Sequence, residues 1–435
     1  MAIMADPAPA SAAIRAEDLS LRRRVGALVF ICLAYGFYAW AWNTVDILRP
    51  YIRADLGLTL AEAGSLYSAQ AIGALIGAVV NGQLADKFGR RRALAVVMLG
   101  YGTCLVAGVF VASYPQVLLQ RVVMGYFMGS MYPICVGIYV GLFPPTVRAK
   151  VASIILGVYN AAVSLLGIAS AALFSAGRDW HLLLWVGLLP IVLAPLAFLL
   201  VPDDRLTIPW GGSPADSGVG GTPAPTAATG KLPISELFSG PFRRRTLLLA
   251  GMTGLNFFAY QAFVGWTTTF LKDVRAVGDA DIGALVGWQF AGSVVGGFFW
   301  GWVGDRYGRR VAAAGFFTAA VLIVPFLYLP MGFAQLQLLA LVIGASYASS
   351  VVWGPWLTEL YPAHLRSTAA SIFNWGRIIS FMAPLVTAAI AERYGLTASM
   401  TLGSVAFTLA GIIWLQQPET LVRNDITTSK EAARA

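Results

Sequence analysis

The sequence predicts an all-α membrane protein in which twelve transmembrane helices form two pseudo-symmetric six-helix bundles. Three observations lead to this fold class. Of 435 residues, 58% are hydrophobic and only 12% are charged, and the mean hydropathy of +0.71 is too high for a water-soluble domain of this size. Many apolar runs are long enough to cross about 30 Å of hydrocarbon. A charged loop between two such runs occurs a second time later in the chain.

The predicted helices form two sets separated by a polar stretch. They lie near residues 25–48, 60–84, 93–113, 116–141, 149–176, 181–201, 246–270, 281–304, 311–330, 335–359, 368–391 and 396–416. The predicted organisation is an N-terminal tail (1–24), a first bundle (25–201), a linker (202–245), a second bundle (246–416) and a C-terminal tail (417–435). The linker is rich in Gly, Ser and Pro, which predicts a flexible segment.

The distribution of basic residues predicts the orientation. Most of the 30 Lys and Arg residues fall in the tails, the linker and the loops on one side of the membrane. On the other side we count only Arg49, Arg53, Arg178, Lys272, Arg275 and Arg393. The positive-inside rule therefore predicts a multi-pass protein of the cell's inner (plasma) membrane with both termini in the cytoplasm. The net charge of +9 is explained by loops that border lipid, so no nucleic-acid partner is expected.

The duplicated loop gives the chain its internal repeat. Residues 81–92 read NGQLADKFGRRR, and residues 300–310 read WGWVGDRYGRR about 219 positions later. Residues 143–148 (FPPTVR) and 361–366 (YPAHLR) match at nearly the same offset. Many secondary transporters place one substrate site between two such repeats. The loop pattern G-x-x-x-D-x-x-G-R-R resembles the signature of the major facilitator superfamily, and this resemblance spans the whole chain.

The resemblance implies that the repeated loops form a cytoplasmic gate. Gly82 and Gly301 are expected to let neighbouring helices approach closely. Asp86 and Asp305 would then meet the positive N-terminal ends of the fifth and eleventh helices, near Arg148 and Arg366. We expect the remaining members of the gate to be Gly89, Arg90, Arg148, Arg309, Glu359 and Arg366. The first half has Gly141 in place of Glu359, which predicts an asymmetric gate; the alternative is that these charged loops only set topology.

One arginine is predicted near the middle of the membrane. Arg377 lies about ten residues into the eleventh helix, with Asn374 one turn earlier on the same face. The second half has no acidic residue at comparable depth, and arginine binds carboxylates through two parallel hydrogen bonds. The missing counter-ion is therefore predicted to be the substrate. The segment from Gly376 to Pro384 resembles a pattern of the aromatic acid/proton symporters and their organic-acid relatives, which implies a carboxylate substrate. The alternative is a structural arginine that binds helix-end carbonyl groups.

Asp46 and Arg121 are predicted to form a second buried site. They enter helices one and four at similar depth, where either charge alone would be unfavourable. A pair with a protonatable acid suits proton coupling, although the resembling families usually place their acids earlier in helix one, where this chain has residues 38–41 (YAWA). A static ion pair is the alternative. Other substrate contacts are expected from polar and aromatic side chains, namely Asn43, Tyr159, Asn160, Tyr260, Gln261 and Gln289.

Together these features predict a secondary active transporter of a small organic acid, coupled to protons and working by alternating access. No enzyme is expected, since no nucleophile–base set, nucleotide-binding loop or dinucleotide fingerprint occurs. The three cysteines lack metal-ligand spacing, so neither a metal nor a cofactor is expected. The expected partners are the organic acid, protons and the lipid bilayer, and the protein is expected to be a monomer. The alternatives are a sugar or polyol carrier, an organic-anion exchanger and a membrane receptor without transport.

Overall fold

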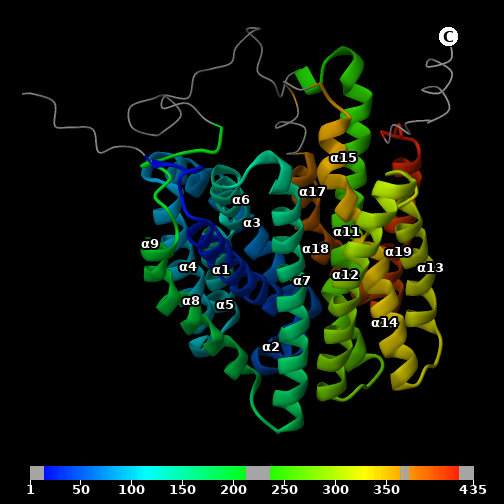
Figure 1. Ribbon diagram of the computed structural model, residues 1–435. Coiled ribbons are helices and arrows are strands. Elements are labelled where there is room, and N and C mark those ends of the chain that lie inside the picture. Colours follow the sequence, from blue (N-terminus) through cyan, green and yellow to red (C-terminus); the bar gives the residue numbers. More distant parts are fainter. Residues whose placement is uncertain (1–13, 212–235, 363–364, 366–371, 421–435) are drawn as a thin grey trace, which may run out of the picture.

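The computed structural model describes residues 14–211, 236–362, 365 and 372–420, and it is built almost entirely of helices (Figure 1). The first half contains α1 (Leu21–Ile47), α2 (Arg49–Leu56), α3 (Leu60–Phe88), α4 (Arg90–Ala107), η1 (Gly108–Phe110), α5 (Tyr114–Met128), α6 (Met131–Leu142), α7 (Pro145–Ser175), η2 (Trp180–Gly187), α8 (Leu188–Leu193), η3 (Ala194–Leu196) and α9 (Ala197–Leu200). The second half contains η5 (Gly240–Phe242), α11 (Arg243–Asp273), α12 (Asp279–Tyr307), α13 (Ala313–Tyr328), α14 (Phe333–Tyr347), η6 (Ala348–Val352), α15 (Trp353–Glu359), α17 (Ile372–Ser380), α18 (Met382–Tyr394) and α19 (Leu396–Leu415). In Figure 1 the first half is blue to green and the second half is green to red.

Ten of the helical segments in the described chain are long and apolar enough to cross a membrane. The other two predicted positions hold the shorter apolar helix α13 and the pair α17 and α18, which is interrupted at Phe381. The predicted fold class, an all-α membrane protein, is confirmed. Several spans consist of consecutive shorter helices, because glycine and proline residues interrupt the regular backbone hydrogen bonding.

Glycines bring the helix backbones of each half into contact. A Cβ added to Gly77 of α3 would lie 1.8 Å from the carbonyl oxygen of Tyr126 in α5. At the repeat offset, a Cβ on Gly296 of α12 would lie 2.2 Å from the carbonyl oxygen of Ala345 in α14. Only glycine allows such an approach, which gains dispersion energy along the whole pair of helices.

The prediction that Gly82 and Gly301 make this close contact is wrong. A Cβ added at either position would meet no atom within 4 Å. Both residues lie closer to the helix ends than the crossing point of each helix pair, so they face open space. The hydrogen bonds beside the crossing points keep the internal symmetry, since the side chain of Asn81 donates to the Tyr126 carbonyl at 2.8 Å and that of Trp300 to the Ala345 carbonyl at 2.9 Å.

The two halves are joined at one end of the molecule, which we call the Arg49 end. We call the opposite end, which carries Asp86 and Asp305, the motif end. Near the Arg49 end, α7 packs along α12, where the Ser164 hydroxyl donates to the Gly287 carbonyl at 2.8 Å. There α3 packs on α18, and the Ser68 hydroxyl donates to the Phe381 carbonyl at 2.5 Å.

Part of the predicted tail and linker is paired at the motif end. Strand β1 (Ile14–Arg15) runs parallel to β2 (Thr207–Ile208). The next residues attach this pair to the first half, since the Trp210 amide donates to the Gly141 carbonyl at 2.9 Å and Arg24 lies 4.9 Å from the centre of the Trp210 ring. The linker therefore contacts the first half at the position where the second half has Glu359.

Replacing Gly77 should destabilise the protein far more than replacing Gly82. Gly77→Ala forces α3 and α5 apart, which should reduce the free energy of unfolding by about 1–3 kcal/mol or more. Gly82→Ala adds a methyl group in open space and improves helix propensity, so its effect should lie within about 1 kcal/mol and be neutral or stabilising. Thermal unfolding of the detergent-solubilised variants measures both effects. Equal losses in the two variants would contradict this account of the helix contacts.

Candidate functional site

The repeated acids at the motif end pair within their own halves. Asp86 lies 3.6 Å from Arg90, and its side chain is 75% exposed. Asp305 lies 2.6 Å from Arg309, and its side chain is 73% exposed. The guanidinium of Arg148 donates to the Phe143 carbonyl at 2.9 Å, and Arg366 lies outside the described residues. Among the described residues, the ion pairs of both acids therefore stay within one half, and the two carboxylates face solvent.

The two repeated loops differ in their ion pairs. In the second half, Arg309 also binds Glu359 at 3.2 Å. Burial lowers the pKa of the Arg309 guanidinium, but the hydrogen bonds that it donates to Glu359 and Asp305 outweigh burial, so its pKa is raised above the ordinary value. In the first half, Arg90 instead donates to the Gly137 carbonyl at 3.2 Å. In the first half, which lacks an equivalent of Glu359, a neutral backbone carbonyl thus accepts from Arg90 where a carboxylate accepts from Arg309 in the second half.

Each repeated loop is also held by an acid that sequence reasoning missed. Gly89 and Gly308 adopt positive φ angles of 96° and 114°, which favour glycine. The Asp204 carboxylate accepts from the Arg90 amide at 2.9 and 3.0 Å, and the Glu419 carboxylate accepts from the Arg309 amide at 2.9 Å. The Asp204 carboxylate lies at the N-terminus of α4, where a negative charge is favourable, whereas Glu419 binds the turn before α13. The signal in the sequence was an acid shortly after the last helix of each half.

Three ionisable side chains are buried together near the Arg49 end. Asp46, Arg49 and Arg121 expose 4%, 0% and 2% of their surface. The predicted direct pairing of Asp46 with Arg121 is not what the structure shows. Asp46 instead binds Arg49 at 2.6 Å, because a residue three positions on in the next helical turn reaches it without crossing to another helix.

Arg121 is left with neutral partners. Its guanidinium donates to the Thr44 hydroxyl at 3.1 Å and to the side-chain oxygen of Gln70 at 3.3 Å. Its Nε atom is buried and has no hydrogen-bond partner among the described residues. Two buried arginines therefore share one buried aspartate, and this cluster carries an excess positive charge.

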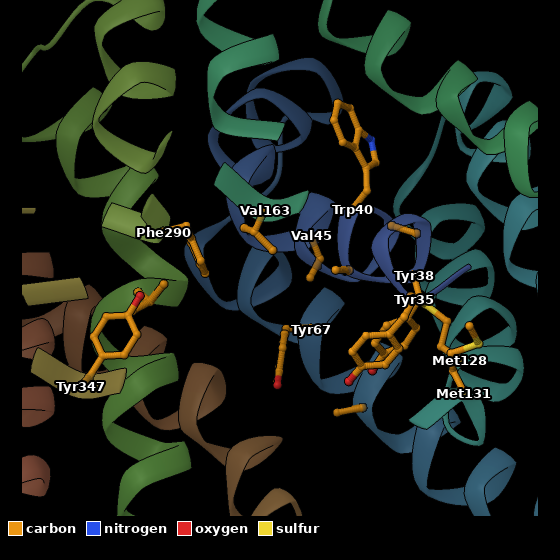
Figure 2. Packing of buried hydrophobic residues seen from close by; sticks show 14 of the residues in the cluster. Tyr35, Tyr38, Trp40, Val45, Tyr67, Met128, Met131, Val163, Phe290 and Tyr347 are labelled. Atoms are coloured by element: carbon orange, nitrogen blue, oxygen red, sulfur yellow. The ribbon is translucent and has the colours of Figure 1, made fainter. Parts of the chain in front are cut away.

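Tyrosines of both halves form aromatic contacts. Tyr35 and Tyr38 of α1 stack with ring centres 5.1 Å apart, and Tyr159 of α7 lies 5.8 Å from Tyr35. In the second half, Tyr260 and Tyr347 meet edge to face at 5.7 Å. Figure 2 shows Tyr35 and Tyr38 on the first half and Tyr347 on the second, with Tyr67 between them in this view.

The structure brings several predicted substrate residues together. The Asn43 amide donates to the Tyr159 hydroxyl at 3.0 Å, and Tyr260 lies within electrostatic range of Tyr159 and Asp46 across the interface. The Gln261 amide donates to Asp46 at 3.5 Å. Asn160 only donates to the Leu156 carbonyl of its own helix, at 3.3 Å.

Gln289 stands out because its amide nitrogen is buried without a partner among the described residues. Its counterpart at the repeat offset is Gln70, which accepts from Arg121 and donates to the Trp42 carbonyl at 3.1 Å. The position equivalent to Arg121 is Ala340. The second half thus keeps the glutamine but lacks the arginine. The amide nitrogen of Gln289, unlike that of Gln70, has no acceptor among the described residues, so this donor is available for a ligand.

Arg377 and Asn374 lie on α17, whose backbone is described, but their side chains are outside the described part of the structure. The helix packs tightly on α11, since a Cβ added to Gly376 would lie 2.7 Å from the backbone of Thr253. Residue 377 is therefore the next residue after Gly376, which contacts α11, and α11 also carries Tyr260 and Gln261.

Comparison with known proteins gives a consistent family. The model of the Major Facilitator Superfamily matches residues 31–278 and 275–434. A gallate transporter from Pseudomonas putida is 25% identical over 432 residues, which cover 93% of each chain. A cis,cis-muconate transport protein from Acinetobacter baylyi is 23% identical over 408 residues, which cover 90% of this chain and 95% of the relative.

Solved structures show the same fold. A bacterial homolog of the human lysosomal transporter Spinster, in an inward-facing and unoccupied conformation, superposes with a TM-score of 0.73 at 16% identity, covering 92% of this chain and 97% of that one. A D-xylose-proton symporter superposes with a TM-score of 0.68 at 15% identity, covering 90% and 95% of the two chains.

The paired glutamines should differ in their effect on stability. Gln70→Leu removes an acceptor from buried Arg121, which should lower the free energy of unfolding by about 1–3 kcal/mol. Gln289→Leu removes a donor that has no partner, so the ligand-free protein should be unchanged or slightly more stable. Thermal unfolding without substrate tests the difference. A Gln289→Leu loss as large as that of Gln70→Leu would show that Gln289 has a structural role.

Proposed function

The chain belongs to the major facilitator superfamily, and from this premise we propose that it is a secondary active transporter that moves a small organic acid together with protons by alternating access. The gallate and muconate transporters among its relatives support a carboxylate substrate. The tyrosines between the halves suit an aromatic acid as one member of this class. In the proposed topology both termini and the motif end face the cytoplasm of a cell whose inner membrane holds the two six-helix bundles.

The excess of buried positive charge is the observation that carries this proposal. An unpaired guanidinium in the membrane is unfavourable by a few kcal/mol or more. Asp46 is buried with both Arg49 and Arg121, so an anionic substrate lowers the energy of the loaded protein in a way that a neutral sugar does not. This charge balance favours an organic acid over a sugar or polyol.

We place the substrate carboxylate at Arg377 of α17, assisted by Asn374. A planar guanidinium suits a carboxylate because two parallel hydrogen bonds form. The rest of the molecule would contact the neighbouring faces of α11, α12 and α7. The unpartnered amide of Gln289 supports a polar contact there, and Gln261, Tyr260, Tyr159, Asn43 and Asn160 are the further proposed contacts.

Asp46 is the proposed proton site, with Arg121 as a nearby positive charge rather than a direct partner. Protonation of Asp46 would remove the carboxylate charge that binds Arg49. The two arginines would then favour an added anion more strongly, so that proton and substrate support each other's binding. A static ion pair predicts no such dependence.

The repeated loops are the proposed cytoplasmic gate. In the structure Asp86 and Asp305 face solvent, which fits a state in which their contacts with the opposite half are broken. In the other state they would meet the N-termini of the eleventh and fifth predicted helices. The Arg49 end would then open.

Removing Arg377 should weaken binding of the acid specifically. Arg377→Ala should lower the affinity for an aromatic carboxylate by about 10–100-fold, since a charged hydrogen-bonded contact is lost. Arg377→Lys keeps the charge but loses the planar fork and should also bind poorly. Titration of purified protein with the acid and with its neutral amide gives the result. The amide should bind the native protein and Arg377→Ala equally poorly, whereas unchanged affinity of Arg377→Ala for the acid would argue for a structural arginine.

Asp46→Asn should abolish the coupling of transport to the proton gradient. With no proton to carry, the variant should fail to accumulate substrate against a gradient but should still exchange internal for external substrate. Uptake into proteoliposomes with a lower pH outside than inside measures accumulation, and counterflow at equal pH on the two sides measures exchange. Accumulation that survives the substitution would place the coupling proton elsewhere.

A further inference from the structure

Arg49 crosses from the first half into the second at the Arg49 end. Its side chain is completely buried, and its guanidinium donates to the carbonyl oxygen of Gly265 in α11. The same guanidinium lies 4.4 Å from the centre of the Trp266 ring. The Trp266 indole donates in turn to the Thr387 hydroxyl of α18 at 2.7 Å. One side chain of the first half thus contacts α11 and, through Trp266, reaches α18.

A second hydrogen bond crosses in the opposite direction. The Thr268 hydroxyl of α11 donates to the backbone carbonyl of Asp46 at 2.7 Å. Thr268 is 2% exposed, so this bond is also shielded from water. Asp46 therefore accepts from the second half through its backbone and holds Arg49 through its carboxylate.

The two crossing bonds are equivalent under the internal repeat. Adding the repeat offset converts Asp46 to Gly265 and Arg49 to Thr268. In each half, one residue offers its carbonyl, and the residue three positions later donates a side-chain hydrogen bond to the carbonyl of the opposite half. Such a reciprocal contact is what a two-fold interface requires. Because the two bonds are equivalent, separation of the two halves at this end lengthens both of them.

We infer that Arg49 and Thr268 form a reciprocal latch that closes the Arg49 end, so that both bonds break together when this end opens. This inference goes beyond the identity of the substrate and rests on the proposed alternating access. Asp46 serves as the positioning group for Arg49. Buried charged bonds across an interface matter far more than exposed ones.

The chain provides a matched control for the latch. Arg53 forms an ion pair with Asp273, which also joins the two halves near this end. Their side chains are 31% and 36% exposed, so solvent and salt weaken this attraction. Arg53→Ala should therefore leave the equilibrium between the closed and open states nearly unchanged.

A cysteine at position 388 reports opening of this end. Ala388 of α18 is buried, and its Cβ would lie 3.4 Å from a Cβ on Gly64 of the first half. We propose to place Ala388→Cys in a background with Cys32 and Cys104 replaced by alanine, and to label intact cells with a membrane-impermeant maleimide. The same background without Ala388→Cys keeps only Cys135, which is buried and reports general loosening.

Arg49→Ala should raise the labelling rate at position 388 about tenfold or more, and Thr268→Val about two- to tenfold, with Cys135 unreactive throughout. Arg53→Ala should stay within about twofold of the parent. The latch would be overturned if Arg49→Ala and Thr268→Val both left the labelling rate at position 388 unchanged, or if labelling of Cys135 rose equally. If Arg49→Ala does not fold, Thr268→Val alone decides. No substrate is added, so a wrong assignment of the substrate does not affect the result.

Discussion

The structure depends on how three charges are accommodated away from water. Asp46, Arg49 and Arg121 are buried where an unpaired charge is strongly unfavourable. One carboxylate is buried with two guanidinium groups and binds only that of Arg49. The other hydrogen bonds of the two arginines go to hydroxyl, amide and backbone oxygens. This arrangement connects the two halves and has one formal positive charge more than it has negative charges. Protonation of Asp46 would remove the negative charge that binds Arg49. In the proposed mechanism, substrate class, proton coupling and closure of one end depend on the same local charge balance.

The internal repeat explains both the common framework and its functional departures. Glycine crossings and their neighbouring hydrogen bonds recur at the same offset in both halves. The departures occur at the proposed substrate site and at the motif end. Arg121 has no counterpart in the second half, where its position is held by Ala340, and the amide nitrogen of Gln289 has no acceptor within the described ranges of the chain. At the motif end, Glu359 in one half is replaced by Gly141 in the other, which is contacted by the linker through Trp210.

The sequence was sufficient for the features that depend on long patterns. Hydropathy located the ten described helical segments that are long and apolar enough to cross a membrane. The repeated loop identified the two halves, and both signals are reliable because they extend over many residues. Individual partners were less predictable. The choice of Arg49 over Arg121 as the partner of Asp46 depends on side-chain reach, and the tight glycines are Gly77 and Gly296 because helix crossing points follow from three-dimensional packing. The acids that hold the repeated loops, Asp204 and Glu419, are distant in sequence from the amides they bind.

The central claim is that the protein carries an organic anion together with protons. The most direct measurement is the external pH of a weakly buffered suspension of proteoliposomes when an aromatic carboxylate is added without any imposed ion gradient. We expect the outside to become more alkaline as the organic anion and protons enter together, and we expect liposomes without the protein to show no such change. Substrate uptake without a pH change, or uptake only when a counter-substrate is present inside, would contradict it.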